Sequence, residues 1–194
     1  LVKYSTFTHR DVDRLSEADG VALLKKLGVH PSPAGSPKGV LREGQGEGEL
    51  AKIVSDWDGH ALTISLLGSY LAEKHGGDLA HLADLPAPLA DEPRYERVHR
   101  VLRRYDEHLT LTEREFLKLF SAFRAPVHEA AFGKVFIPLL SSFIFPDEER
   151  RKTKEDILVD RVARLVVYRI LKHDPATQTY TAHPLVRNHY LAHL

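Results

Sequence analysis

Residues 58–77 read DGHALTISLLGSYLAEKHGG, and this stretch predicts the helix around which the other elements pack. Its apolar residues fall on almost every side of a helical wheel, and a helix that is apolar all round is a buried helix. Asp58 is expected to accept the free N–H groups of the first turn, and Gly76 to take the left-handed conformation that ends the helix. Three small residues predict points of close approach by neighbouring helices: Ser65, Gly68 and Ser69.

Composition limits the class of protein. The chain has 194 residues, 43% of them hydrophobic, which suffices for one large domain or two small ones. Its 27 basic and 27 acidic residues balance, so nucleic acid is not expected as a partner. The absence of cysteine excludes disulfides and thiolate zinc sites and favours a cytoplasmic location. No apolar run reaches membrane-spanning length, so no membrane is expected as a partner. The absence of methionine indicates a fragment of a longer protein.

Residues 1–85 predict a small helical domain. Ser16 lies three residues before Asp19, which is a capping pattern, and it opens a predicted helix over 17–27 with Gly28 placed to end it. The other predicted elements before and after the central helix are an extended lead-in over 1–12, a Gly/Pro/Ser-rich loop over 30–48, and helices over 49–57 and 78–82.

Residues 86–108 predict a linker followed by a connecting helix. Three prolines break regular structure over 85–93, and a charged helical pattern then runs from Arg94 to His108. Its apolar face consists of Val98, Val101, Leu102 and Tyr105. The arginines on this helix are either a partner surface or, as is commoner for charge runs, a solvated face.

Residues 109–194 predict a winged-helix domain. Thr112 and Glu115 fit a capping box at the start of its first helix. Further helices are expected over 126–136 and 155–166, strands over 167–173 and 179–182, and a terminal helix from His183 and Pro184. The predicted fold class is therefore mainly α: a small helical domain followed by a winged-helix domain with a two-stranded β hairpin.

Three local patterns, in this order, resemble the helical and winged-helix domains of STAND-class signalling ATPases, the group that includes NB-ARC proteins. Residues 15–24, LSEADGVALL, are similar to the family's L-S-x-x-[ED]-A-x-x-L-L entry to the helical domain. Residues 59–64, GHALTI, are similar to its G-x-P-L-A-L motif, with Ala61 in place of the usual proline. Residues 182–187, AHPLVR, resemble its M-H-D-L-[IV]-R motif, with the histidine kept and the methionine and aspartate replaced.

The resemblance implies a regulatory role in a larger protein. In that family ADP lies between an upstream P-loop nucleotide-binding domain and these two domains, and exchange for ATP with Mg permits oligomerisation. A downstream sensor or repeat domain is also implied. The nucleotide-contacting residues in the intact parent would be Gly59 and Ala61 beside the base, His183 near the β-phosphate, and Arg187 one turn further on.

No phosphate-binding motif of the form G-x-x-x-x-G-K-[ST] occurs, so this chain is not expected to act as an enzyme or to bind a cofactor alone. His183 is as readily a cap at a domain surface as a phosphate contact. A zinc site built from His183, His189 and His193 is disfavoured because the set lacks a cysteine and a placed carboxylate.

Two other classes of function stay open from the sequence. A winged-helix DNA-binding protein needs a basic recognition helix, whereas 155–166 carries three acidic residues against two arginines. A protein-interaction scaffold without nucleotide is the other alternative.

Overall fold

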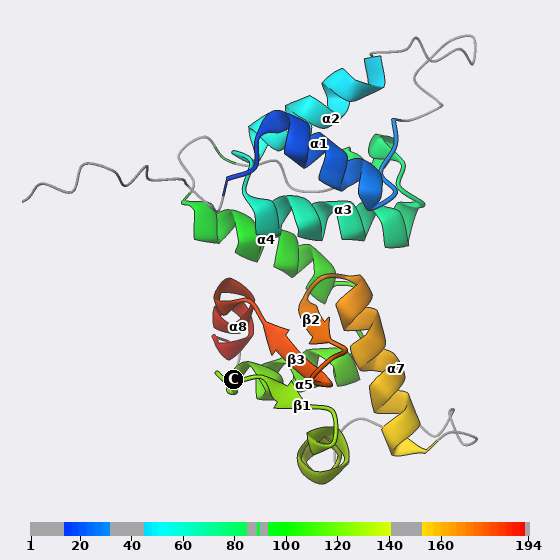
Figure 1. Ribbon diagram of the computed structural model, residues 1–194, viewed down its shortest axis with the longest axis vertical. Helices are drawn as coiled ribbons and strands as arrows, with labels where there is room; N and C mark the ends of the chain where they lie inside the picture. The colour runs from blue at the N-terminus through cyan, green and yellow to red at the C-terminus, as the bar shows by residue number, and fades with distance from the viewer. Residues whose placement is uncertain (1–13, 32–44, 85–88, 90–92, 141–152, 193–194) are drawn as a thin grey trace, which may run out of the picture.

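The computed structural model describes residues 14–31, 45–84, 89, 93–140 and 153–192. These residues are mainly helical and include a small three-stranded antiparallel sheet. Figure 1 shows α1, α2 and α3 on one side of α4, and the sheet with α5, α7 and α8 on the other. The lead-in expected over 1–12 lies outside the described residues, as do most of the loop over 30–48 and most of the linker before α4.

The helical part contains α1 (Glu17–Lys26), α2 (Gln45–Asp56), α3 (Ala61–His75) and a 3₁₀ helix, η2 (Leu79–Asp84). Ser16 caps α1 as expected, because its side chain accepts the Asp19 N–H. Helix α2 begins four residues earlier than the pattern indicated, within the glycine-rich stretch. Its first turn is held by contacts distant in sequence: Gly46 lies against Pro31, and Glu47 pairs with Lys25 of α1.

The middle of helix α3 is buried on all sides, as its sequence predicts, whereas Glu73 and Lys74 near its end are exposed. Its buried residues are Thr63, Ile64, Leu66, Leu67, Gly68, Ser69, Tyr70 and Leu71. A Cβ at Gly68 would lie 2.6 Å from a Leu27 methyl group, so glycine permits the close approach of α1. Gly76 ends the helix in the left-handed conformation. The expected cap was wrong: Asp58 has φ 56° in the turn before the helix, and His60 takes the capping position.

Helix α4 (Arg94–Asp106) packs against both α3 and α8. The four apolar residues of its predicted face are fully buried: Val98, Val101, Leu102 and Tyr105. The Tyr105 hydroxyl donates to the backbone carbonyl of Leu66 in α3 at 2.7 Å and lies 3.3 Å from the carbonyl of Tyr168. The core is consequently continuous from the first part of the chain to the second.

The second part begins with α5 (Leu111–Ser121) and β1 (Val127–His128), continues through a π-helix, η3 (Phe132–Phe136), and α6 (Ile137–Leu140), and ends with α7 (Lys154–Val167), β2 (Leu171–Asp174), β3 (Thr179–Ala182) and α8 (Pro184–Leu191). The sheet has the order β1-β3-β2, and both pairs are antiparallel.

Three expectations for this part were wrong in detail. The helix expected over 126–136 is replaced at its start by β1, because Val127 and His128 pair with Tyr180 and Thr179 of β3. The first hairpin strand begins at 171 rather than 167, since α7 continues to Val167. The capping box of α5 consists of Thr110 and Glu113, two residues before the expected pair.

None of the described helices is long and apolar enough to cross a membrane.

Leu67→Ala tests the packing of α3. Leu67 is fully buried, so the substitution is expected to lower the free energy of unfolding by about 2–5 kcal/mol through lost contacts and a residual cavity. Urea unfolding measures the change. Glu73→Ala, at an exposed position of the same helix, is the control and should change it by less than about 0.5 kcal/mol. A loss below about 1 kcal/mol for Leu67→Ala would contradict the packed core.

Candidate functional site

The turn before α3 requires glycine at position 59. Gly59 is buried with φ 61°, and a Cβ there would lie 2.5 Å from the Leu15 carbonyl oxygen. Its carbonyl accepts the Leu15 N–H at 2.7 Å, and its own N–H donates to the Val54 carbonyl at 2.8 Å. Arg14 binds the same turn through an ion pair with Asp58. The glycine of the 59–64 motif therefore has a structural role in this turn.

His60 caps α3, and Ala61 is the first residue of the helix. The His60 ring nitrogen Nδ1 lies 3.3 Å from the Thr63 backbone N and 2.8 Å from the Thr63 hydroxyl. His60 is buried, whereas Ala61 is partly exposed. The sequence predicts Asp58 rather than His60 as the cap, although the place of His60 just before the apolar run of α3 is a signal for that position.

His183 caps α8 with Pro184 at the first helical position, as the sequence predicts. Nδ1 of His183 accepts the Leu185 N–H at 3.2 Å, and the residue is exposed. Arg187 lies one turn further along, and its Nη1 donates to the Phe123 carbonyl at 3.2 Å. One function of Arg187 is thus to join α8 to the end of α5.

The four predicted site residues fall into two pairs on different helices, with α4 packed against both helices. Gly59 and Ala61 lie at the start of α3, and His183 and Arg187 at the start of α8. In Figure 1 both helix starts lie on the left of the view, above and below α4. The fold therefore places the two motifs on different helices, both of which pack against α4.

Two hollows in the surface lie away from these four residues. One, of about 480 Å³, lies between α1 and α2. The other, of about 370 Å³, is formed by the end of α4 with α5 and α8. None of Gly59, Ala61, His183 and Arg187 lines either hollow.

The contact between α4 and α8 contains titratable groups. His189 is 3% exposed, and its Nε2 lies 2.8 Å from Oδ2 of Asp106. The His99 ring centroid is 5.3 Å from that of His189. Burial, and then the proximity of His189, lower the pKa of His99 below its ordinary value. His189 therefore faces inward toward Asp106 rather than a site shared with His183, and the described residues contain no group of three metal ligands.

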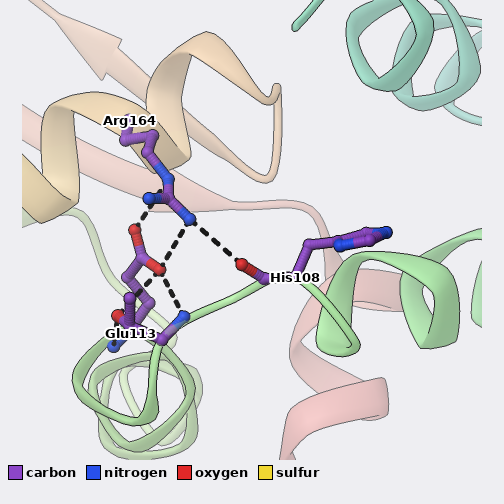
Figure 2. A network of polar contacts seen from close by, with 4 residues as sticks. His108, Glu113 and Arg164 are labelled. Atoms are coloured by element: carbon purple, nitrogen blue, oxygen red, sulfur yellow. Dashed lines mark hydrogen bonds and ion pairs between the residues drawn. The ribbon is translucent and has the colours of Figure 1, made fainter. Parts of the chain in front are cut away.

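A buried ion pair joins α7 to the turn between α4 and α5 (Figure 2). Glu113 is fully buried, with its Oε1 3.0 Å from Nε of Arg164 and its Oε2 3.1 Å from Nη2. The Thr110 backbone N–H and hydroxyl donate to the same Oε2 at 2.7 and 2.8 Å. Arg164 also donates to the His108 carbonyl at 3.2 Å. These bonds fix α7 relative to the end of α4.

Tyr70 extends this junction to α3. Its hydroxyl lies 2.8 Å from Nε2 of His108. Burial, followed by the positive charges of Lys74 and Arg104, lowers the pKa of His108. The neutral imidazole is therefore favoured in this contact, which spans the first and second parts of the chain.

Comparison with known proteins leaves the family open. No protein-family model matches the chain, and no curated protein is significantly similar to it. The three motifs remain resemblances, and a functional assignment depends on the residues described above.

Arg164→Ala is expected to destabilise the chain strongly. It leaves the Glu113 carboxylate buried without its charged partner, and such losses typically cost about 3–5 kcal/mol. Chemical denaturation measures the change. Lys118→Ala, which breaks a partly exposed pair with Glu115, should cost less than about 1 kcal/mol. The double variant Glu113→Gln with Arg164→Met should recover part of the lost stability. If Arg164→Ala leaves the free energy of unfolding unchanged, the ion pair does not stabilise the junction.

His99→Gln tests the α4–α8 contact through pH. Because the pKa of His99 is lowered in the folded chain, the unfolded chain binds more protons as pH falls below about 6.5. The stability associated with neutral His99 is present above that pH and is lost on acidification. We expect the variant to lose less stability than the wild type between pH 7 and 5, measured by urea unfolding across that range. Equal losses would contradict a half-buried His99 that stays neutral in the folded chain.

Proposed function

We propose that this chain is the regulatory part of a nucleotide-switched ATPase of the STAND class, related to NB-ARC proteins. It would contribute a helical domain and a winged-helix domain that close over ADP or ATP held by a separate P-loop domain. The order of elements in the second part of the chain supports the winged-helix assignment, because a winged helix combines such helices with a small antiparallel sheet. That order is α5, β1, η3 with α6, α7, β2 and β3.

One observation carries the proposal: both functional motifs open a helix on either side of α4. The first turn of a helix presents free N–H groups and the positive end of its dipole, which suits an anion. His183 is exposed at such a position, immediately after β3. A phosphate group near α8 and a base near the Gly59 turn are thus compatible with the positions of the two motifs.

Each motif residue would contact a different part of the nucleotide. Nδ1 of His183 already accepts the Leu185 N–H, so its Nε2 would carry the proton donated to the β-phosphate. Arg187 has Nη1 bound to the Phe123 carbonyl, so an anion would meet its other guanidinium nitrogens. Gly59 and Ala61 would meet the base through backbone and methyl surface, without the proline that the family usually has there.

The proposal implies partners and a cofactor only in the intact protein. The upstream P-loop domain would supply most nucleotide and Mg contacts, and a downstream sensor or repeat domain would control release. Oligomerisation would follow the exchange of ADP for ATP. The exposed position of His183 is compatible with this arrangement, because an upstream domain could reach it.

The DNA-binding alternative is weakened by the position of Arg164. This arginine is committed to Glu113, which leaves Lys154 and Arg161 as the other basic residues of α7. Three acidic residues share that helix: Glu155, Asp156 and Asp160. A helix with this balance is poorly suited to a phosphate backbone.

Titrations of the isolated chain test the class of function. We expect neither labelled duplex DNA at physiological salt nor ADP to bind with micromolar affinity, because the proposed nucleotide site needs the upstream domain. Fluorescence anisotropy measures both. Micromolar binding of duplex by the isolated chain would favour the DNA-binding alternative and contradict the proposal.

His183→Ala in the intact protein tests the proposed phosphate contact. A hydrogen bond to a charged group contributes about 1.5–3 kcal/mol, so ADP should dissociate roughly ten- to a hundredfold faster. The protein should also oligomerise without its stimulus. Stopped-flow release of labelled ADP and size-exclusion chromatography measure the two effects.

His183→Asn is the matched control for the helix cap, because asparagine also caps helices well. It should restore the stability lost in His183→Ala without restoring the donor geometry of an imidazole. If ADP dissociation is unchanged in His183→Ala while the chain is destabilised, His183 only caps α8.

A further inference from the structure

Among the helix caps that the structure describes, two are histidines and three are hydroxyl groups. Ser16, Thr110 and Thr153 cap α1, α5 and α7 through side-chain oxygens. His60 and His183 occupy the same position at α3 and α8. Hydroxyl caps do not titrate in the physiological range, but an imidazole does, with an ordinary pKa of about 6.5.

The capping geometry assigns the proton of each ring. Backbone N–H groups only donate, so Nδ1 must present a lone pair to Thr63 in one case and Leu185 in the other. The neutral ring then carries its hydrogen on Nε2. A protonated imidazole carries hydrogen on both nitrogens and accepts no bond at Nδ1.

We propose that His60 and His183 are acid-labile caps, which release the first turns of α3 and α8 together when their imidazoles are protonated. Protonation removes the acceptor of each cap and places a cation at the positive end of a helix dipole. Both effects oppose the capped form. The stability that the caps contribute is therefore complete above about pH 6.5 and is lost as pH falls through that value.

The charged groups around His60 do not reverse the direction of this pH effect, which is a loss of stability on acidification. Arg14 pairs with His60 through a backbone bridge and remains positive, so it disfavours a second cation beside it. Asp58 in the adjoining turn favours protonation but is already paired with Arg14. Asp56, at the end of α2, is exposed to solvent, which screens its charge.

Two groups near His183 act in the same direction. Arg187 lies one turn along α8. On α4, His99 lies near the Leu185 backbone. These groups are cationic or become cationic on acidification, so they oppose a protonated His183.

The inference goes beyond the proposed function, because the capping chemistry does not depend on a nucleotide. Where the proposed function holds, its consequence is regulatory, since acid would loosen both helix starts that carry the motif residues. His128 accepts the Ala130 N–H through Nδ1 in a similar way, but it begins no α-helix and serves as an internal reference for the tautomer.

Long-range ¹H–¹⁵N NMR of the imidazole rings in the chain tests the proton assignment directly. At pH 8 we expect His60 and His183 to be Nε2–H tautomers. On titration to pH 5, the amide shifts of Thr63 and Leu185 should move with the same midpoints as the adjacent rings. An Nδ1–H tautomer for either ring at pH 8 would overturn the proposal for that helix.

Asparagine variants test the effect on stability, because asparagine caps a helix without titrating. Between pH 7.5 and 5.5 the wild-type folding equilibrium constant should fall by about fivefold more than that of His183→Asn, the usual effect of one cap. In the double variant His60→Asn with His183→Asn, the fall in the folding equilibrium constant over this pH range should be smaller by a further factor of about five. Nucleotide is absent from this experiment, so its failure is distinct from a failure of the proposed ADP contact.

His81→Asn is the control, since His81 is exposed and caps no helix. It should keep the wild-type dependence on pH, including the contributions of His99 and His108. If the buried His60 does not tolerate substitution, the exposed His183 carries the test alone. A His183→Asn chain with the wild-type dependence on pH would overturn the proposal.

Discussion

The buried hydroxyl of Tyr105 is the interaction on which the arrangement of this chain depends. It donates to the Leu66 carbonyl of α3 and lies within hydrogen-bond distance of the Tyr168 carbonyl that follows α7. Burial raises the pKa of Tyr105 well above its ordinary value, so the hydroxyl keeps its proton at any physiological pH. Because one side chain joins backbone groups from both parts, α4 is a shared core element rather than a flexible linker.

The remaining contacts around α4 differ in chemistry. Toward α3 the helix contributes apolar side chains and Tyr105, whereas toward α8 it contributes Asp106 and His99, which meet His189. The Glu113–Arg164 pair adds a buried charge contact between α5 and α7. Apolar contacts persist across the physiological pH range, but the contact at His99 weakens in acid, because the lowered pKa of His99 favours its neutral ring. In the proposed switch, the polar boundary with α8 is consequently the part most sensitive to conditions.

The placement of the motif residues has a functional consequence. Each pair lies at a helix start, where backbone N–H groups need acceptors, and the fold satisfies part of that need with imidazole. The same groups suit a phosphate, and they lie outside the two hollows described above. This combination agrees with a site that is completed by another domain, and it gives histidine two roles, as a cap and as a proposed donor.

Local patterns in the sequence determined much of this fold. The burial of α3, the apolar face of α4, the Ser16 cap and the start of α8 at His183 and Pro184 all follow from residues within one or two helical turns. Tertiary structure decided the rest. Thr110 with Glu113 and Thr112 with Glu115 fit the capping pattern equally well, and only Glu113 meets Arg164, 51 residues away. Likewise β1 exists because β3 pairs with it, and His60 replaces Asp58 as the cap because the turn is held by Leu15 and Val54. Such partners are distant in the chain, so no local pattern contains them.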